Sequence, residues 1–155
     1  MGRPTSFYYK TPQECGADSC SQEVIALGTP LLWWLATIAL LFVLGMWIRA
    51  MAQRQVDPAK TIIIAGMAAG YLPWFFFQQR TVFTFYAIAF EPFLILSLVF
   101  GARMILSTFR KNGEIILGTL FILLFINFVY FLPIYMGDVI TYESWLSRMW
   151  FPSWI

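Results

Sequence analysis

Long apolar stretches separated by short polar segments run through most of the chain. Four of them carry at most one charged residue, at positions 29–48, 61–77, 81–102 and 115–137. A helix needs about 20 residues to cross the hydrocarbon core of a bilayer, and these stretches are about that long. Backbone N–H and C=O groups inside lipid must be paired internally, so we expect helices rather than strands. The pattern predicts an all-α integral membrane protein with about four transmembrane helices.

The composition excludes several other classes of protein. Of the 155 residues, 60% are hydrophobic and 12% are charged, whereas soluble domains carry about 25% charged residues. The net charge of +2 comes from 10 basic and 8 acidic residues, which is too balanced for a nucleic-acid-binding surface. Histidine is absent and there are only two cysteines, so we expect no metal site and no protein-bound cofactor.

The charges between the apolar stretches predict the orientation. Basic residues outnumber acidic ones in segments 49–60 and 103–114, while acidic residues outnumber basic ones near both ends. The positive-inside rule then places these two middle segments in the cytoplasm. We therefore expect a multi-pass protein of the cell membrane with both termini extracytoplasmic. Residues 1–28 are predicted as an extracytoplasmic loop segment, and residues 29–155 as a four-helix transmembrane module with a short outer tail.

Both ends carry further expectations. The start of the chain is polar and lacks the apolar core of a secretory signal, so we interpret Met1 as an internal residue of a longer chain or a secondary start. Cys15 and Cys20 are candidates for a small disulfide in an oxidising compartment, with two free cytoplasmic thiols as the alternative. The aromatic tail, residues 142–155, is expected to lie along the outer leaflet. The extracytoplasmic acids are expected to be solvated; they are Asp18, Glu23, Asp138 and Glu143.

Two charged residues lie beside or inside the predicted spans. Arg80 falls in the short outer turn between the second and third spans. A guanidinium there could bind the phosphate of a lipid-linked substrate through two parallel hydrogen bonds, or it could simply bond lipid headgroups. Glu91 is predicted near the middle of the third span, where a carboxylate is costly, and Pro92 would kink the helix there. Glu91 is thus either a functional polar residue or a neutral acid bonded to backbone.

Three ordered blocks of sequence resemble a known family. Residues 71–93 read YLPWFFFQQRTVFTFYAIAFEPF; residues 3–34 contain RPTSFYY, CGADSC and ALGTPLLWW; and residues 142–155 read YESWLSRMWFPSWI. Together they resemble the C-terminal half of the protein O-mannosyltransferases in their actinobacterial form. The resemblance extends over essentially the whole chain.

The resemblance implies a function. Enzymes of this family transfer mannose from polyprenyl-phosphate mannose to Ser or Thr hydroxyls of exported proteins, on the outer face of the membrane. Arg80 matches the family's Arg after Leu-Pro-Trp, which implies a contact with the lipid phosphate. Phe85 and Tyr86 match the Phe-Tyr pair and are candidates for the lipid or sugar path, with core packing as the alternative. No role is carried over to Glu91.

The resemblance also implies that something is missing. The family's catalytic acids lie in the N-terminal half, so we expect no catalytic residue in this chain and no activity from the chain alone. Its expected partners are membrane lipid, the lipid-linked donor, exported acceptor proteins, and the N-terminal half of the enzyme or other membrane subunits. A second hypothesis is a non-catalytic accessory or assembly subunit of a larger membrane complex.

Overall fold

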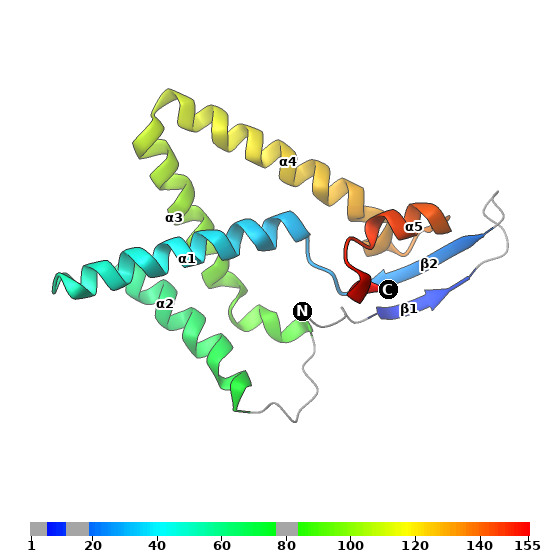
Figure 1. Ribbon diagram of the computed structural model, residues 1–155, viewed down its shortest axis with the longest axis horizontal. Helices are drawn as coiled ribbons and strands as arrows, with labels where there is room; N and C mark the ends of the chain where they lie inside the picture. The colour runs from blue at the N-terminus through cyan, green and yellow to red at the C-terminus, as the bar shows by residue number, and fades with distance from the viewer. Residues whose placement is uncertain (1–5, 12–18, 77–83) are drawn as a thin grey trace. The chain divides into compact units, whose positions relative to one another are not determined.

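The computed structural model describes residues 6–11, 19–76 and 84–155 (Figure 1). The described residues form two compact units, which we treat separately. The terminal unit comprises Met1–Pro30 and Ile122–Ile155, and the helical unit comprises Leu31–Phe121. In chain order the elements are β1 (Ser6–Lys10), β2 (Cys20–Ile25), α1 (Pro30–Ala52), α2 (Pro58–Tyr71), η1 (Leu72–Phe75), η2 (Thr84–Ala89), α3 (Glu91–Phe109), α4 (Lys111–Met136), β3 (Val139–Thr141), α5 (Tyr142–Arg148) and η3 (Pro152–Trp154).

The prediction of a mostly helical membrane protein is confirmed. In the described part of the chain, three helices are long and apolar enough to span a bilayer, namely α1, α3 and α4. The first and fourth predicted spans agree closely with α1 and α4. The second predicted span is built differently: α2 has 14 residues and continues directly into the 3₁₀ helix η1.

The third predicted span begins too early. The sequence predicted a helix from residue 81, whereas α3 begins at Glu91 and runs to Phe109. The reason is Pro92, which has no backbone N–H to donate and is best accommodated in the first turn of a helix. Pro92 therefore opens α3 instead of kinking it, and the prediction that Glu91 lies in the middle of a span is wrong.

Side-chain contacts fix the start of α2. Asp57 caps the helix, since its carboxylate accepts a hydrogen bond from the backbone N–H of Lys60 at 3.2 Å and also pairs with the Lys60 ammonium. Pro58 occupies the first turn, where its missing N–H costs nothing. The indole Nε1 of Trp47 in α1 donates to Thr61 Oγ1 at 3.1 Å, which ties the end of α1 to the start of α2.

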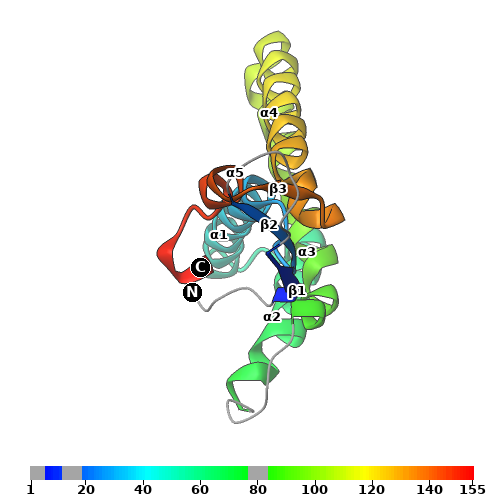
Figure 2. The ribbon, with the colours of Figure 1, turned by 90° about the vertical axis from the view of Figure 1, so that its right-hand side faces the viewer.

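The terminal unit contains a three-stranded antiparallel sheet in the order β1-β2-β3 (Figure 2). Tyr9 pairs with Glu23, and Cys20 pairs with Thr141. The sequence analysis predicted a loop in residues 1–28, yet these residues supply two of the three strands. Buried and partly buried positions alternate along most of β2, which is the pattern of a strand with one face against a core.

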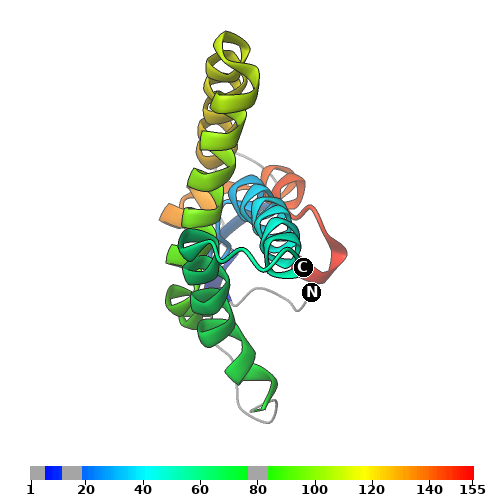
Figure 3. The same cartoon turned by 90° about the vertical axis from the view of Figure 1, so that its left-hand side faces the viewer.

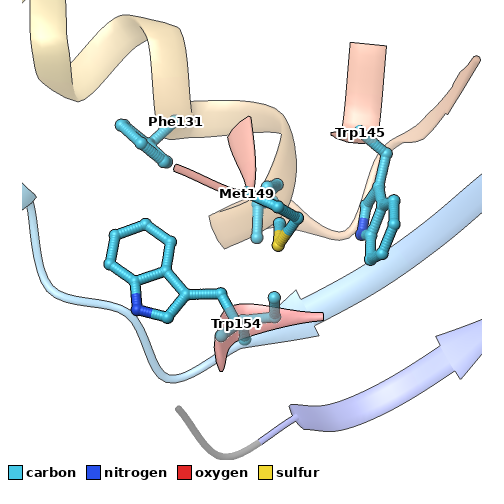
Figure 4. Close-up of a cluster of buried hydrophobic side chains, with 6 residues drawn as sticks. Phe131, Trp145, Met149 and Trp154 are labelled. Atoms are coloured by element: carbon cyan, nitrogen blue, oxygen red, sulfur yellow. The ribbon is translucent and has the colours of Figure 1, made fainter. Parts of the chain in front are cut away.

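The core of the terminal unit lies under this sheet. Its buried members come from β2, the end of α4, α5 and the last residues of the chain; they are Ile25, Phe131, Ile134, Trp145, Met149 and Trp154 (Figure 4). In the C-terminal tail, the side chains of Trp145, Met149 and Trp154 are therefore buried in the protein. Arg148 also links α5 to α4, because its Nε donates a hydrogen bond to the backbone oxygen of Tyr130 at 2.7 Å.

The sheet also constrains how often the chain crosses the membrane. β2 precedes α1 and β3 follows α4, so their pairing requires both segments to lie on the same side of the bilayer. An even number of crossings is needed to return there. Among the described residues three helices are long and apolar enough to cross, which is an odd number, so we expect a fourth crossing between α1 and α3.

Candidate functional site

The candidate site of the helical unit is the junction of α2, η1, η2 and α3. Arg80, the predicted phosphate contact, lies outside the described residues. The elements on either side of it are described, with η1 ending at Phe75 and η2 beginning at Thr84. Figure 3 shows α2 and α3 from the side, and the two helices are in contact. The site can therefore be built from the residues that flank the segment carrying Arg80.

A pair of aromatic rings joins η1 to η2. The ring centroids of Trp74 and Tyr86 are 4.5 Å apart, with an interplanar angle of 36°. The Trp74 indole also donates from Nε1 to the backbone oxygen of Gly70 in α2, at 3.1 Å. Trp74 thus holds η1 against both η2 and the last turn of α2, and its ring has only limited freedom to rotate.

Phe90 is the centre of a second aromatic group, at the turn into α3. Its ring meets the ring of Tyr71 nearly edge-to-face at 5.4 Å, and the ring of Trp33 from α1 at 6.4 Å. Tyr71 in turn meets Phe75 at 5.5 Å. Such edge-to-face pairs are worth about 0.5–1.5 kcal/mol each beyond their buried area. Side chains from α1, α2 and η1 are therefore joined around Phe90, the residue that precedes α3.

Two glycines on α2 allow this close packing. A β-carbon at Gly70 would lie 2.9 Å from Cβ of Phe90 and 3.0 Å from the backbone oxygen of Ala89. One turn earlier, a β-carbon at Gly66 would overlap the ring of Phe93. Neither residue was predicted from the sequence, although the spacing Gly-x-x-x-Gly is a recognised signal for close helix packing in membranes.

The other residues predicted for this region are Tyr86, Phe85 and Glu91. Tyr86 lies in η2 and is half-buried against Trp74. The side chain of Phe85 lies outside the described part of the structure, so its assignment stays a prediction. Glu91 is partly buried and is the first residue of α3, next to the aromatic group around Phe90. The polar role suggested for Glu91 also stays a prediction.

The terminal unit contains a buried carboxylate. Glu23 is 4% exposed, and its Oε2 accepts a hydrogen bond from Trp145 Nε1 at 2.5 Å. The prediction that Glu23 is solvated is therefore wrong, whereas Asp138 and Glu143 are exposed as expected. Asp18 lies outside the described residues. This burial could not be predicted from the local sequence because the partner of Glu23 lies 122 positions away.

The rings of Tyr9 and Tyr142 both contact the indole of Trp145. Their centroids are 6.1 Å and 5.5 Å from that of the indole. The buried acid and its three aromatic neighbours come from β1, β2 and α5. Their contacts join both ends of the chain, and we assign this group a structural role.

The remaining predictions concern the two cysteines and the absence of a metal site. Cys20 is buried and disulfide-bonded. Cys15 lies outside the described residues, so the pairing itself stays a prediction. Within the ranges that the structure describes, no three His, Cys, Asp or Glu side chains are grouped so that they could hold a metal ion. The expectation of no metal and no cofactor stays a prediction.

The described site is thus a set of contacting aromatic side chains from the elements that precede and follow residues 77–83 in the sequence. Aromatic rings offer large apolar faces to an isoprenoid chain or to the C–H face of a sugar, and tyrosine adds a hydroxyl. A guanidinium suits a phosphate. The described aromatic residues suit the apolar part of such a ligand, and the contact of Arg80 with an anionic part stays a prediction.

Comparison with known proteins identifies the same family as the sequence resemblance. A family described as the C-terminal four-transmembrane region of protein O-mannosyltransferase matches residues 1–154. Polyprenol-phosphate-mannose–protein mannosyltransferases of Mycobacterium tuberculosis and Mycolicibacterium smegmatis are each 34% identical over 146 residues, covering 90% of this chain. The corresponding protein of Corynebacterium glutamicum is 31% identical over 160 residues, covering 99% of the chain. No solved structure matches.

The matches include most of this chain but only a small part of each relative. The chain spans 27% of the length of the mycobacterial relatives and 30% of the corynebacterial one. The family match nevertheless includes almost every residue of the chain, and the helices and the aromatic junction are those of a membrane region. The chain belongs to the family of the C-terminal four-transmembrane region of protein O-mannosyltransferases.

Proposed function

We propose that this chain is the C-terminal membrane part of a glycosyltransferase that moves mannose from polyprenyl-phosphate mannose to Ser or Thr hydroxyls of exported proteins. The observation that carries the proposal is the family match over residues 1–154. The names of the relatives supply the donor and the protein acceptor. The aromatic junction around Trp74 and Tyr86 supports the proposal, since it suits a ligand with a long apolar tail.

Arg80 is proposed to bind the phosphate of the donor. Breaking the bond between the anomeric carbon and the phosphate oxygen leaves negative charge on the lipid phosphate. A guanidinium beside those oxygens stabilises that charge as it develops. The charge pattern of the chain supports an extracytoplasmic position for Arg80, together with both termini, in the cell membrane.

Substitution of Arg80 tests this role. In the native protein that contains this chain, Arg80→Ala is expected to lower kcat/KM for the donor by about a hundredfold, the effect typical of losing one charge-stabilising contact. Arg80→Lys restores only part of it, because an ammonium cannot bind two phosphate oxygens in parallel. Arg103→Ala, at an exposed position of α3, is the matched control and leaves donor use unchanged. Equal activity of Arg80→Ala and wild type would overturn the assignment.

The chain alone is proposed to be inactive, because it lacks the part of the enzyme that carries the general base for the acceptor hydroxyl. The purified 155-residue chain, incubated with labelled polyprenyl-phosphate mannose and an acceptor peptide, is expected to transfer no label. Appreciable transfer would contradict this.

A second candidate function is that of an accessory subunit without chemistry. The observation that favours it is the small share of the relatives that this chain spans. The mass of the protein isolated from its native membrane separates the two. A mass near that of a full enzyme supports the first proposal, and the mass of the 155-residue chain supports the second.

A further inference from the structure

Gly70 connects two short helices that are not adjacent in sequence. Its backbone oxygen accepts the hydrogen bond from Trp74 Nε1 in η1, at 3.1 Å. Its α-carbon lies against the backbone of Ala89 and against Phe90, at the end of η2. One residue of α2 therefore contacts both elements that flank the segment 77–83.

The contact on the η2 side cannot relax easily. The atoms that a β-carbon at Gly70 would meet include the backbone carbonyl of Ala89, at 3.0 and 3.1 Å. A side chain could rotate away, but backbone atoms move only if the whole turn moves. Phe90 is further held by the rings of Tyr71 and Trp33. Any side chain at position 70 must therefore push η2 away from α2.

Displacement of η2 would separate the aromatic pair. Tyr86 lies one 3₁₀ turn before Ala89, because such a helix has three residues per turn. Its ring is 4.5 Å from that of Trp74, whose own position depends on the oxygen of Gly70. The positions of the Trp74 and Tyr86 rings therefore both depend on contacts made by Gly70.

We infer that Gly70 is a positioning residue, which by having no side chain holds η1 and η2 together and so places the Trp74–Tyr86 pair for the lipid-linked donor. The last part of this inference rests on the proposed function. The first part is a statement about structure and can be tested without any activity.

The chain offers matched controls for the test. Gly45 in α1 and Gly118 in α4 are also helical glycines, but a β-carbon at either would meet nothing within 4 Å. Gly66→Ala is a different case, because its β-carbon would overlap one edge of the Phe93 ring and meets no backbone atom among its nearest neighbours. All four Gly→Ala variants make the same chemical change, so differences among them report the local contacts.

The first measurement is hydrogen exchange in the native protein reconstituted in nanodiscs. Gly70→Ala is expected to speed exchange about tenfold or more in peptides that cover residues 84–90, while Gly45→Ala and Gly118→Ala leave these peptides unchanged. Unchanged exchange in Gly70→Ala would overturn the structural part of the inference, whether or not the protein transfers mannose.

The second measurement is transfer kinetics on the same preparations. Gly70→Ala is expected to lower kcat/KM for the donor by up to about tenfold, with the acceptor KM unchanged, since a misplacement of about 1 Å can cost about a hundredfold and the neighbours of Gly70 must give by only a few tenths of an ångström. Equal losses for donor and acceptor, or no loss despite faster exchange, would overturn the role in donor binding. If the wild-type protein transfers no mannose, the proposed function fails and the exchange result still decides the structural part.

A milder variant covers the case in which Gly70→Ala does not fold. Trp74→Phe keeps an aromatic ring but removes the N–H that reaches Gly70. It is expected to lower donor kcat/KM by about fivefold, the usual worth of one hydrogen bond. Donor kinetics equal to those of wild type would contradict the support that we assign to Gly70.

Discussion

The terminal and helical units bury their apolar residues in different ways. In the terminal unit, Phe131 is 0% exposed and Trp145 is 5% exposed, within a core built from both ends of the chain. In α1 of the helical unit, Ile38 and Leu41 are each 62% exposed. Water drives apolar groups together in the first case, whereas lipid already solvates them in the second. Close contact in the helical unit therefore depends largely on small residues and ring geometry, beside a few buried side chains such as Val43, which is 0% exposed.

The largest expected effect tests the core of the terminal unit. Phe131→Ala removes a fully buried ring, which typically costs about 3–5 kcal/mol. Phe125→Ala, two turns earlier on α4 at a position that is 60% exposed, is expected to change stability little. Hydrogen exchange of the β2 amides measures the difference. Similar losses for both variants would mean that the exposed side of α4 is packed against protein.

The next effect concerns the buried acid. Glu23→Ala leaves the Trp145 N–H without its acceptor and is expected to destabilise the terminal unit by about 1–3 kcal/mol. Glu23→Gln keeps a weaker, neutral acceptor and should lose roughly half as much. The control is Glu143→Gln, an exposed acid on α5. Exchange rates that respond equally to Glu23 and Glu143 variants would show that burial does not matter there.

The smallest effect is a pH dependence at the start of α2. The hydrogen bond from the Lys60 ammonium, followed by that from its backbone N–H, lowers the pKa of Asp57 below its usual value. A lowered pKa in the folded state means that the stabilisation is present above about pH 4 and is lost as the pH falls through the folded-state pKa. Exchange of the first-turn amides of α2 should therefore speed up in acid. Asp57→Asn should remove this dependence, and an unchanged acid response in that variant would contradict it.

The helices could largely be predicted from the sequence. Bilayer thickness fixes the length of an apolar stretch, so the bounds of α1 and α4 follow from hydropathy alone. The start of α3 could not be located this way, because residues 81–90 are as apolar as the helix that follows. The local signal was Pro92, which favours the first turn, and the sequence analysis interpreted it as a kink instead.

The sheet and the contacts of the site were harder to predict. β1 and β2 form in a segment that is rich in polar and turn-forming residues. The third strand of the sheet, β3, pairs with β2 but follows four α-helices later in the sequence. The burial of Glu23 depends on the same long-range pairing. The support given by Gly70 depends on which backbone lies opposite it, and a single sequence does not contain that information.

The pairing of β2 with β3 has a consequence for biosynthesis. Cys20 pairs with Thr141, so the sheet cannot close until Thr141 has left the ribosome. At 5–20 residues per second, the first strands wait for on the order of ten seconds. During that time Ile25 and Glu23 have no core to enter, because Trp145 has not yet been made. The terminal unit is thus the last part of the region to form, and premature termination between α1 and β3 leaves β2 paired with β1 but without its second partner strand.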